Sequence, residues 1–405
     1  MKLPPLDILM IAPTPFFENR GCHFRIKEEA KALQGAGKTV LIATFGQGEE
    51  VKGLDISRST LDLITFENGP TASWKKIPAL IFLFFTVLRL IFKHRPKVIY
   101  CHLLEGLAVG LKAFFIAKIV SFWSYRPLLI FDTQGNRAEE MKSYGMTSNR
   151  WLLDIFNGLE KFLLRFPDRI FVSSLNYLKK LEEPPDLKNK VEQLTDGPSF
   201  KLRKSPAGQR EKINSLSKIK KYFSAEDYLK IESWLNESKF IAIYTGSFDR
   251  SKGLSDFIEK NLSRFSEKNK VRFIFAGSGQ IQRKDSEIVA WTQKLNDKNL
   301  KTILSLANLG IDPKPKTSTE SSGKIINYMA AGLPVLALKS PNTIFFAEEN
   351  NFLVKKLEDF KSEIVKAGQN QEQIKIIGKK NIARINKKFT WDLQIRKILA
   401  IISHR

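Results

Sequence analysis

Two lysines stand at positions from which they could neutralise a phosphate group. Lys252 belongs to the stretch YTGSFDRSKG, in which a predicted strand ends at Gly246 and a loop follows. Lys324 follows Gly323 at the predicted start of a helix, where backbone N–H groups attract anions. A lysine ammonium binds phosphate as a compact charge. The two stretches therefore predict an anion site, to which Arg250 could add a further charge.

Smaller and more polar residues surround these lysines in the sequence. The stretch FIFAGSGQ places Gly277 and Gly279 at the end of another predicted strand, where small residues would let a ligand approach the backbone. Glu320 lies just before the predicted helix, and Asn327 falls one turn after Lys324 on the same face. Their carboxylate and amide could bind sugar hydroxyls, and the less favoured alternative for Glu320 is a capping charge at the helix start.

Polar residues also follow the predicted strands of the first half. Because ligands of open α/β sheets bind beyond the carboxyl ends of the strands, we expect these residues to belong to a site rather than to the core. For His23, a ligand contact and a structural role at the start of a helix remain equally open. The candidates are Arg20, Gly21 and His23 after the first strand, His102 and Glu105 after a later one, and Asp132 and Gln134 after the next.

Several chemistries are disfavoured by the sequence. Ser318 stands where the phosphate loop of nucleoside triphosphatases needs its first glycine, and the three-glycine dinucleotide fingerprint is missing. The chain has no Asp-x-Asp pair, and neither Cys22 nor Cys101 lies in a metal-ligand spacing. We therefore expect no metal requirement and no bound cofactor.

The elements that must position these residues alternate between strand and helix, which indicates an α/β protein with parallel sheets. The pattern divides into an N-terminal domain over residues 1–195 and a C-terminal domain over 196–388, and a helix at 389–405 is expected to pack back on the first. Both domains are predicted to be doubly wound and Rossmann-like, facing a central cleft that holds the site. The helix over residues 151–166 is predicted to be mostly core. The predicted strands are 8–12, 39–44, 98–102, 128–131, 169–172, 240–245, 271–276, 304–312 and 335–338.

The composition points to an anionic partner. The 405 residues include 66 basic and 42 acidic ones, a net charge of +24. Residues 77–92 and 107–123 form two predicted helices that are apolar nearly all round and have basic neighbours. Two interpretations remain, a pair of buried crossover helices or an apolar face lying on an anionic membrane, and we favour the second. The first run is short for a membrane span and contains Arg89.

With these residues assembled, the chain resembles the family 4 glycosyltransferases of the GT-B fold, in a bacterial branch. The stretch GKIINYMAAGLPV is similar to the family's K-L-L-E-Y-M-A-x-G-x-P-V signature, and Gly246 with Lys252 and Gly253 matches its G-x-x-x-x-x-K-G pattern. In the first half, RGCHFRIKEEAKAL, HLLEG and FDTQGN carry the likeness.

The resemblance implies roles for individual residues. Lys252, Lys324 and the backbone after Gly323 would bind the diphosphate of a nucleotide-sugar, and Gly21 would lie beneath it from the other domain. Glu320 would hold sugar hydroxyls. Asn327 stands where the family usually has a ribose-binding Glu, and Ser247 stands where it commonly has an Arg, so that Arg250 is the nearest substitute.

The expected function is therefore a metal-independent, retaining transfer of a sugar from a nucleotide-diphosphate sugar to a membrane-associated glycolipid or polysaccharide precursor. Lys252, Lys324, Glu320 and Asp132 are the expected catalytic residues. The expected location is the cytoplasm, on the inner face of the membrane. Alternatives are a non-catalytic GT-B-like binding subunit, a sugar-nucleotide epimerase and, from charge alone, a nucleic-acid-binding protein, which the membrane interpretation of the charge disfavours.

Overall fold

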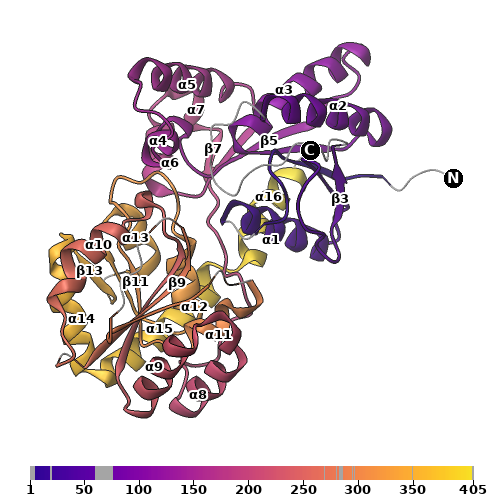
Figure 1. Ribbon diagram of the computed structural model, residues 1–405. Helices are drawn as coiled ribbons and strands as arrows, with labels where there is room; N and C mark the ends of the chain where they lie inside the picture. Colours follow the sequence, from indigo (N-terminus) through magenta and orange to yellow (C-terminus); the bar gives the residue numbers. More distant parts are fainter. Residues whose placement is uncertain are drawn as a thin grey trace. The chain divides into compact units, whose positions relative to one another are not determined.

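The chain folds into two α/β units, which are described separately below (Figure 1). The structure is a computed structural model that describes residues 5–18, 21–59, 76–268, 270–279, 281, 286–293, 295, 297–348 and 350–403. Unit 1 comprises Met1–Asp196, the tripeptide Thr319–Ser321 and Trp391–Arg405, and unit 2 comprises Gly197–Ser318 and Ser322–Thr390. The sequence had placed the boundary one residue earlier, and Arg20 lies outside the described residues.

Unit 1 is built on a seven-stranded parallel sheet with the order β3-β2-β1-β4-β5-β6-β7. Its strands are β1 Ile8–Ala12, β2 Val40–Thr44, β3 Asp55–Arg58, β4 Val98–His102, β5 Leu128–Thr133, β6 Arg169–Val172 and β7 Val191–Gln193. Its helices are α1 Gly21–Gly35, α2 Lys76–His94, α3 Leu103–Val120, α4 Arg137–Ser143, α5 Arg150–Leu163, α6 Leu175–Glu182, α7 Pro185–Lys188 and α16 Trp391–Ser403.

Both faces of this sheet are covered, which is why its central strand is apolar at every position. Alternate side chains of a strand point to opposite faces. In β1, Leu9 and Ile11 join the core under α2 and α3, whereas Ile8 and Met10 join the core under α1 and α16. The last helix thus belongs to the first unit, where it packs against α1 (Figure 1).

Unit 2 repeats this plan on a six-stranded parallel sheet with the order β10-β9-β8-β11-β12-β13. Its strands are β8 Phe240–Ser247, β9 Val271–Ser278, β10 Val289–Trp291, β11 Leu309–Asp312, β12 Val335–Leu338 and β13 Phe352–Val354. Its helices are α8 Gln209–Lys218, α9 Ala225–Asn236, α10 Leu254–Asn261, α11 Leu300–Leu304, α12 Gly323–Ala330, α13 Pro341–Ala347, α14 Phe360–Gln369 and α15 Gln371–Lys388. The segment Arg250–Lys252 forms a single 3₁₀ turn, η2.

The predicted α/β architecture is confirmed, but several strand boundaries are not. The strand predicted over 304–312 is wrong in its first half, because α11 ends at Leu304 and β11 begins only at Leu309. The strand predicted over 128–131 continues to Thr133. The four strands β3, β7, β10 and β13 were not predicted, and each has only three or four residues at or near a sheet edge.

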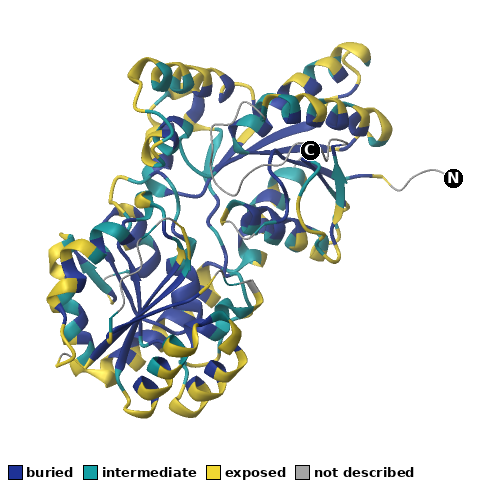
Figure 2. Ribbon diagram, viewed as in Figure 1, coloured by how far each residue is buried: buried dark blue, intermediate teal, exposed yellow. Residues whose placement is uncertain are grey.

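The prediction for the α5 region was wrong. Its apolar residues recur at helical spacing, but α5 buries only Glu160 and Leu163. Trp151 is 72% exposed and Phe162 is 53% exposed, so the apolar side of this helix faces outward (Figure 2). An apolar side with this spacing occurs both on helices that pack against a core and on helices that expose it. The periodicity alone therefore could not predict whether the side is buried.

Helix α2 also exposes apolar side chains, as expected. Ile77, Ile81 and Phe85 are at least half exposed, whereas the polar Thr86 is buried. Among the described residues, α2 is the one helix whose length and composition would let it cross a membrane. A third of its apolar window is buried, and core helices of soluble proteins meet the same criterion.

Candidate functional site

The candidate anion site of unit 2 lies at the carboxyl ends of β8, β9 and β11, which are neighbours in the sheet. Gly246 of β8 is paired with Gly277 of β9, and Asp312 is the last residue of β11. Helix α12 begins at Gly323, shortly after β11. This is the edge at which a parallel sheet presents its loops and helix N-termini to ligands.

Lys324 is held in a fixed position at this edge. Its ammonium group donates a hydrogen bond to the Tyr244 hydroxyl at 3.0 Å and lies 4.3 Å from the centre of the Tyr244 ring. The Asp312 carboxylate is 3.6 Å away, and the Lys324 side chain is 16% exposed. A half-buried lysine with these contacts is preorganised, and part of its charge remains available to a ligand.

Lys252 acts on the same tyrosine. It ends the turn η2, and the next residue, Gly253, has a φ of +76°. Burial is the main cause that raises the pKa of Tyr244 well above its usual value, and the nearby Asp312 raises it further. The positive charge of Lys252 opposes both effects. Both predicted lysines are therefore electrostatically coupled to one buried phenol, which keeps its proton at neutral pH.

The glycines of this site make room for protein atoms. A Cβ on Gly277 would lie 1.8 Å from the Gly246 carbonyl oxygen, and one on Gly279 would lie 2.9 Å from the Phe248 backbone nitrogen. A Cβ on Gly246 would lie 2.9 Å from Cε of Lys324. The expected close approach of a ligand to these glycines remains a prediction, and the packing of the chain alone already excludes side chains there.

The start of α12 is fixed without a side-chain cap. The Thr-Ser-Thr-Glu-Ser-Ser run before the helix is rich in capping residue types, but the Ser322 side chain makes no capping hydrogen bond. Its hydroxyl donates instead to the Asp312 carboxylate. Asp312 therefore connects the helix start with Lys324, and the other end of the helix stops near Gly332, at φ +78°, as expected.

Three other predicted donor residues have different surroundings. Asn327 is 9% exposed, and its amide binds the backbone N–H of Ser199 at 2.9 Å and the Ser199 hydroxyl at 3.3 Å. It therefore fixes the segment that enters unit 2. Arg250 is exposed, whereas Glu320 precedes α12 in the tripeptide that groups with unit 1.

Unit 1 holds a buried network of charges around Arg25. Its guanidinium donates two hydrogen bonds to the Asp132 carboxylate, at 2.8 and 2.6 Å. It also lies 3.0 Å from Glu29 and donates to Asp196 at 2.9 Å. His102 completes the network, with its Nδ1 3.2 Å from Asp132. Arg25, Glu29, Asp132 and His102 are all buried.

The pKa values in this network follow from burial and pairing. Burial raises the pKa of Glu29, and Arg25 opposes this only partly. For Asp132, burial alone would raise the pKa. The interactions with Arg25 and His102 outweigh burial, so the pKa of Asp132 is lowered. Burial lowers the pKa of His102, although Asp132 pulls it upward. We therefore describe the centre as an Arg25–Asp132 ion pair with a neutral His102 beside it.

This network is also the one place among the described residues where three potential metal ligands, Glu29, His102 and Asp132, come within 4.8 Å of one another. The Arg25 guanidinium already binds both carboxylates and supplies the compensating positive charge. A cation would have to displace it, and the network fits a structural ion pair better than a metal site.

The network corrects the predicted placement of one residue. Asp132 was expected after the strand over 128–131, but it lies within β5, whereas His102 ends β4 as the predicted strand over 98–102 does. Neither has exposed surface, and Asp132 is bonded on both oxygens. The geometry gives Asp132 a positioning role toward Arg25, and a direct catalytic role stays a prediction.

The remaining predicted residues of unit 1 are placed as follows. His23 is buried, lies tilted against Phe16 with the ring centres 5.9 Å apart, and accepts a hydrogen bond from the Glu18 backbone at Nδ1. Of the two alternatives for His23, the structural one fits this burial. Glu105 lies in α3 and pairs with Arg137 at 3.0 Å. Gln134 follows β5 as expected, and Gly21 is the exposed first residue of α1.

Sequence reasoning missed the residues that organise both clusters. Tyr244 and Asp312 were not named, although both lie within predicted strands near the carboxyl ends, where a polar side chain is a usable signal. Arg25 was not among the predicted site residues either. Its partners Asp132 and Asp196 are 107 and 171 residues away, and no local pattern indicates such pairs.

Comparison with known proteins identifies a family match for the part of the chain that contains this site. Residues 239–370, which contain both lysines, match the family described as "Glycosyl transferases group 1". These residues therefore form a glycosyltransferase group 1 domain, and the match supports the predicted resemblance to the family 4 glycosyltransferases. No curated protein sequence matches this glycosyltransferase significantly.

Solved structures of similar fold cover the whole glycosyltransferase. Sucrose-phosphate synthase from Thermosynechococcus elongatus aligns with a TM-score of 0.73 at 15% identity, over 98% of both chains. Anabaena HepE in complex with UDP-glucose aligns with a TM-score of 0.71 at 15% identity, over 99% of this chain and 100% of HepE. WaaG, a glycosyltransferase involved in lipopolysaccharide biosynthesis, aligns with a TM-score of 0.63 at 12% identity, over 98% and 99% of the two chains. The predicted GT-B fold and enzyme class are confirmed.

Proposed function

We propose that this glycosyltransferase transfers a sugar from a nucleoside-diphosphate sugar, and that Lys252 and Lys324 bind the diphosphate of the donor. The observation that carries the proposal is the coupling of both lysines to Tyr244, within the residues that match the glycosyltransferase family. The complexes of HepE with UDP-glucose and of starch synthase IV from Arabidopsis thaliana with ADP support a nucleotide-linked donor.

The chemistry requires positive charge where the leaving group forms. Breaking the bond between the sugar and the diphosphate leaves the bonding electrons on a phosphate oxygen, and fixed positive groups stabilise that oxygen as its charge develops. Two ammonium groups and the N-terminus of α12 supply this stabilisation in the proposal. The sequence has no Asp-x-Asp pair to hold a metal, so we propose metal-independent transfer. Retention of the anomeric configuration is proposed from the resemblance alone.

Tyr244 and Asp312 are proposed to position Lys324 before the donor binds. The ammonium group of Lys324 already has a hydrogen bond and a neighbouring carboxylate in the structure. A diphosphate would compete with Asp312 for this charge, whereas Ser322 keeps a hydrogen bond to the same carboxylate. The site therefore needs little reorganisation when an anion arrives.

The acceptor is proposed to be a glycolipid or a polysaccharide precursor on the inner face of the cytoplasmic membrane. The support is the exposed apolar side of α2, which includes Ile81 and Phe85, next to basic residues at its C-terminal end such as Lys93 and Lys97. Apolar side chains that enter an interface and cations that meet anionic lipid act together in peripheral binding.

The lysine assignment is tested by turnover of labelled nucleotide-sugars and by release of the nucleoside diphosphate. Lys252→Ala or Lys324→Ala is expected to cost about 3 kcal/mol of transition-state stabilisation, a reduction of about two orders of magnitude in kcat/KM. Lys218→Ala removes the same charge from an exposed position of unit 2 and is the matched control. Wild-type turnover in both single variants would exclude the assignment, and loss of activity on chelation would exclude metal independence.

One observation favours a second candidate, a non-catalytic subunit that binds a nucleotide-sugar. Asn327 is engaged with Ser199, and Ser247 replaces the phosphate-binding Arg expected from the resemblance. Calorimetric binding of a nucleotide-sugar without any release of nucleoside diphosphate, with or without lipid acceptors, would identify such a subunit.

A further inference from the structure

Helix α5 of unit 1 has an uncovered apolar side. We name the side chains on it the apolar stripe: Trp151, Ile155, Leu159, Phe162 and Phe166, which follows the helix. Trp151 is 72% exposed and the least exposed member, Phe166, is 37% exposed. The spacing of four, four, three and four residues keeps them on one side of the helix.

The apolar stripe continues onto α3. The ring of Phe166 lies 5.1 Å from that of Phe162 and 5.7 Å from that of Phe115 in α3. Beyond the end of α3, Phe122 is 92% exposed, and Trp123 is 53% exposed with the Lys118 ammonium 5.3 Å from its ring. The ring contacts join the stripe to Phe115, and exposed apolar patches of this kind mark binding surfaces on soluble proteins.

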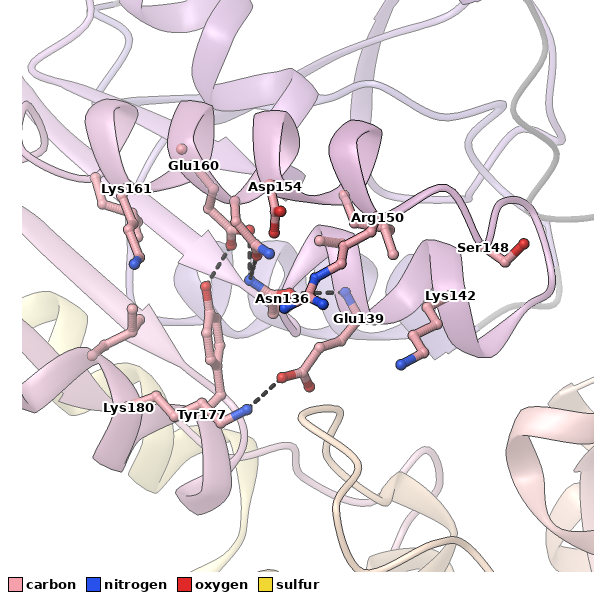
Figure 3. Close-up of a pocket in the computed structure, with 16 residues that line it drawn as sticks. Asn136, Glu139, Lys142, Ser148, Arg150, Asp154, Glu160, Lys161, Tyr177 and Lys180 are labelled. Atoms are coloured by element: carbon pink, nitrogen blue, oxygen red, sulfur yellow. Dashed lines mark hydrogen bonds and ion pairs between the residues drawn. The ribbon is translucent and has the colours of Figure 1, made fainter.

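A cavity of about 890 Å³ lies between α4, α5 and α6, beside the stripe (Figure 3). Its α5 wall includes Arg150, Asp154 and Lys161, each of which lies one position before a member of the stripe. Since successive residues of a helix point about 100° apart, cavity and stripe occupy adjacent sides of the same helix.

Basic side chains outnumber acidic ones around the cavity, with Lys142, Arg150, Lys161 and Lys180 against Glu139, Asp154 and Glu160. In the described part of the chain, Lys142, Arg150 and Lys161 form no ion pair with a carboxylate, whereas Lys180 pairs with Glu139. Figure 3 shows these side chains around one hollow. Unpaired cations that surround a cavity attract an anionic group.

The inner part of the cavity is a rigid polar framework. Glu160 is 2% exposed and accepts hydrogen bonds from the Tyr177 hydroxyl, from Nδ2 of Asn136 at 2.9 Å and from the Arg137 backbone at 3.2 Å. Asn136 also donates to Asn157 at 3.2 Å. These bonds join α4, α5 and α6, so the cavity is a fixed feature of the unit (Figure 3).

We propose that this cavity binds the phosphate-bearing head group of a membrane lipid, whose hydrocarbon chains lie along the apolar stripe. The inference rests on the membrane association in the proposed function and assigns it a second contact area besides α2. A free phosphate would account only for the cations, and a protein partner only for the stripe. A lipid with an anionic head group and apolar chains accounts for both adjacent sides of α5.

The test is sedimentation of the full chain with vesicles of phosphatidylcholine, with and without phosphatidylglycerol. Arg150→Ala/Lys161→Ala is expected to weaken binding to the anionic vesicles about thirtyfold, since each surface cation contributes roughly fivefold. Trp151→Ser/Phe162→Ser is expected to weaken binding to both vesicle types. Lys218→Ala and Leu229→Ser change an exposed cation and an exposed apolar residue of unit 2 and are the matched controls.

The outcomes separate this inference from the proposed function. Wild-type binding by both α5 variants, together with loss of binding in Ile81→Ser/Phe85→Ser, would overturn the inference and leave membrane association standing. Failure of the wild-type chain to bind either vesicle would overturn both, while the donor assay of the lysine variants would stay unaffected. If inorganic phosphate binds in the cavity while the α5 variants bind vesicles like the wild type, the ligand of the cavity is a soluble anion and the inference is overturned. A change from dimer to monomer in the stripe variant would identify a second copy as the occupant.

Discussion

Replacing Arg25 by Met should destabilise unit 1 strongly, because one guanidinium compensates several buried carboxylates. The side chain is 2% exposed and pairs with Asp132, Glu29 and Asp196. Methionine keeps most of the apolar stem and removes only the charge and its hydrogen bonds. The variant therefore isolates the electrostatic contribution from that of packing.

The expected cost is about 3–5 kcal/mol of the free energy of unfolding, the range for removing one partner of a buried pair. Asp132 determines this value, because it has no exposed surface and depends on Arg25 for two hydrogen bonds. In the wild-type protein, Arg25 keeps the pKa of Asp132 low. Without Arg25, burial would raise the folded-state pKa above the unfolded value of about 4, so the stability of the variant should fall as pH rises from about 4 toward 7.

The assay is urea unfolding at about pH 5 and about pH 7, followed by the fluorescence of the tryptophans. Asp132→Asn in the Arg25→Met background should recover part of the loss, since it removes the buried charge that lacks a partner. Arg210→Met, at an exposed position in α8, should change stability by no more than about 0.5 kcal/mol. A loss below about 1 kcal/mol, or strict additivity of the two unit 1 substitutions, would refute the account of the network.

Two further predictions concern unit 2. Burial lowers the pKa of Lys212 to about 8, so the folded state releases its proton before the unfolded state does, and the free energy of unfolding should rise between about pH 8 and about pH 10. Lys212→Met should abolish that rise in urea titrations, and an unchanged slope would exclude Lys212 as its source. Gly253→Ala should destabilise unit 2 by more than about 1 kcal/mol, because φ is +76° and a Cβ would lie 2.1 Å from the Pro313 carbonyl oxygen. Gly208→Ala has open space around its Cβ and is the control, and equal melting temperatures of the two variants would contradict this reasoning.

The sequence predicted the α12 region well because its boundaries have local causes. Gly332 takes a positive φ that favours glycine, and Pro334 follows before β12 begins at Val335. Such signals act within a few residues and are visible in the sequence. The same holds for the central strands, whose continuous apolar runs reflect burial on both faces.

The sequence did not predict features that depend on distant partners. Asp132 read as a loop residue because a carboxylate is rarely buried in a strand, and only Arg25, 107 residues away, makes that burial possible. The aromatic ring of Tyr244 is typical of a core residue in a strand. Its role at the site depends on the hydrogen bond that its hydroxyl accepts from Lys324, which lies 80 residues away. The short strands β7 and β13 owe their existence to a neighbouring strand rather than to their own composition.

The position of α16 has a consequence for synthesis on the ribosome. Ile395 and Ile398 complete the core over which α1 packs, but they are translated after all of unit 2. At 5–20 residues per second, unit 2 takes roughly ten to forty seconds to emerge. During that interval the nascent first unit presents the apolar surface of α1 that α16 will cover, so the later-made unit can finish folding before the earlier-made one, and chaperones have a defined surface to protect.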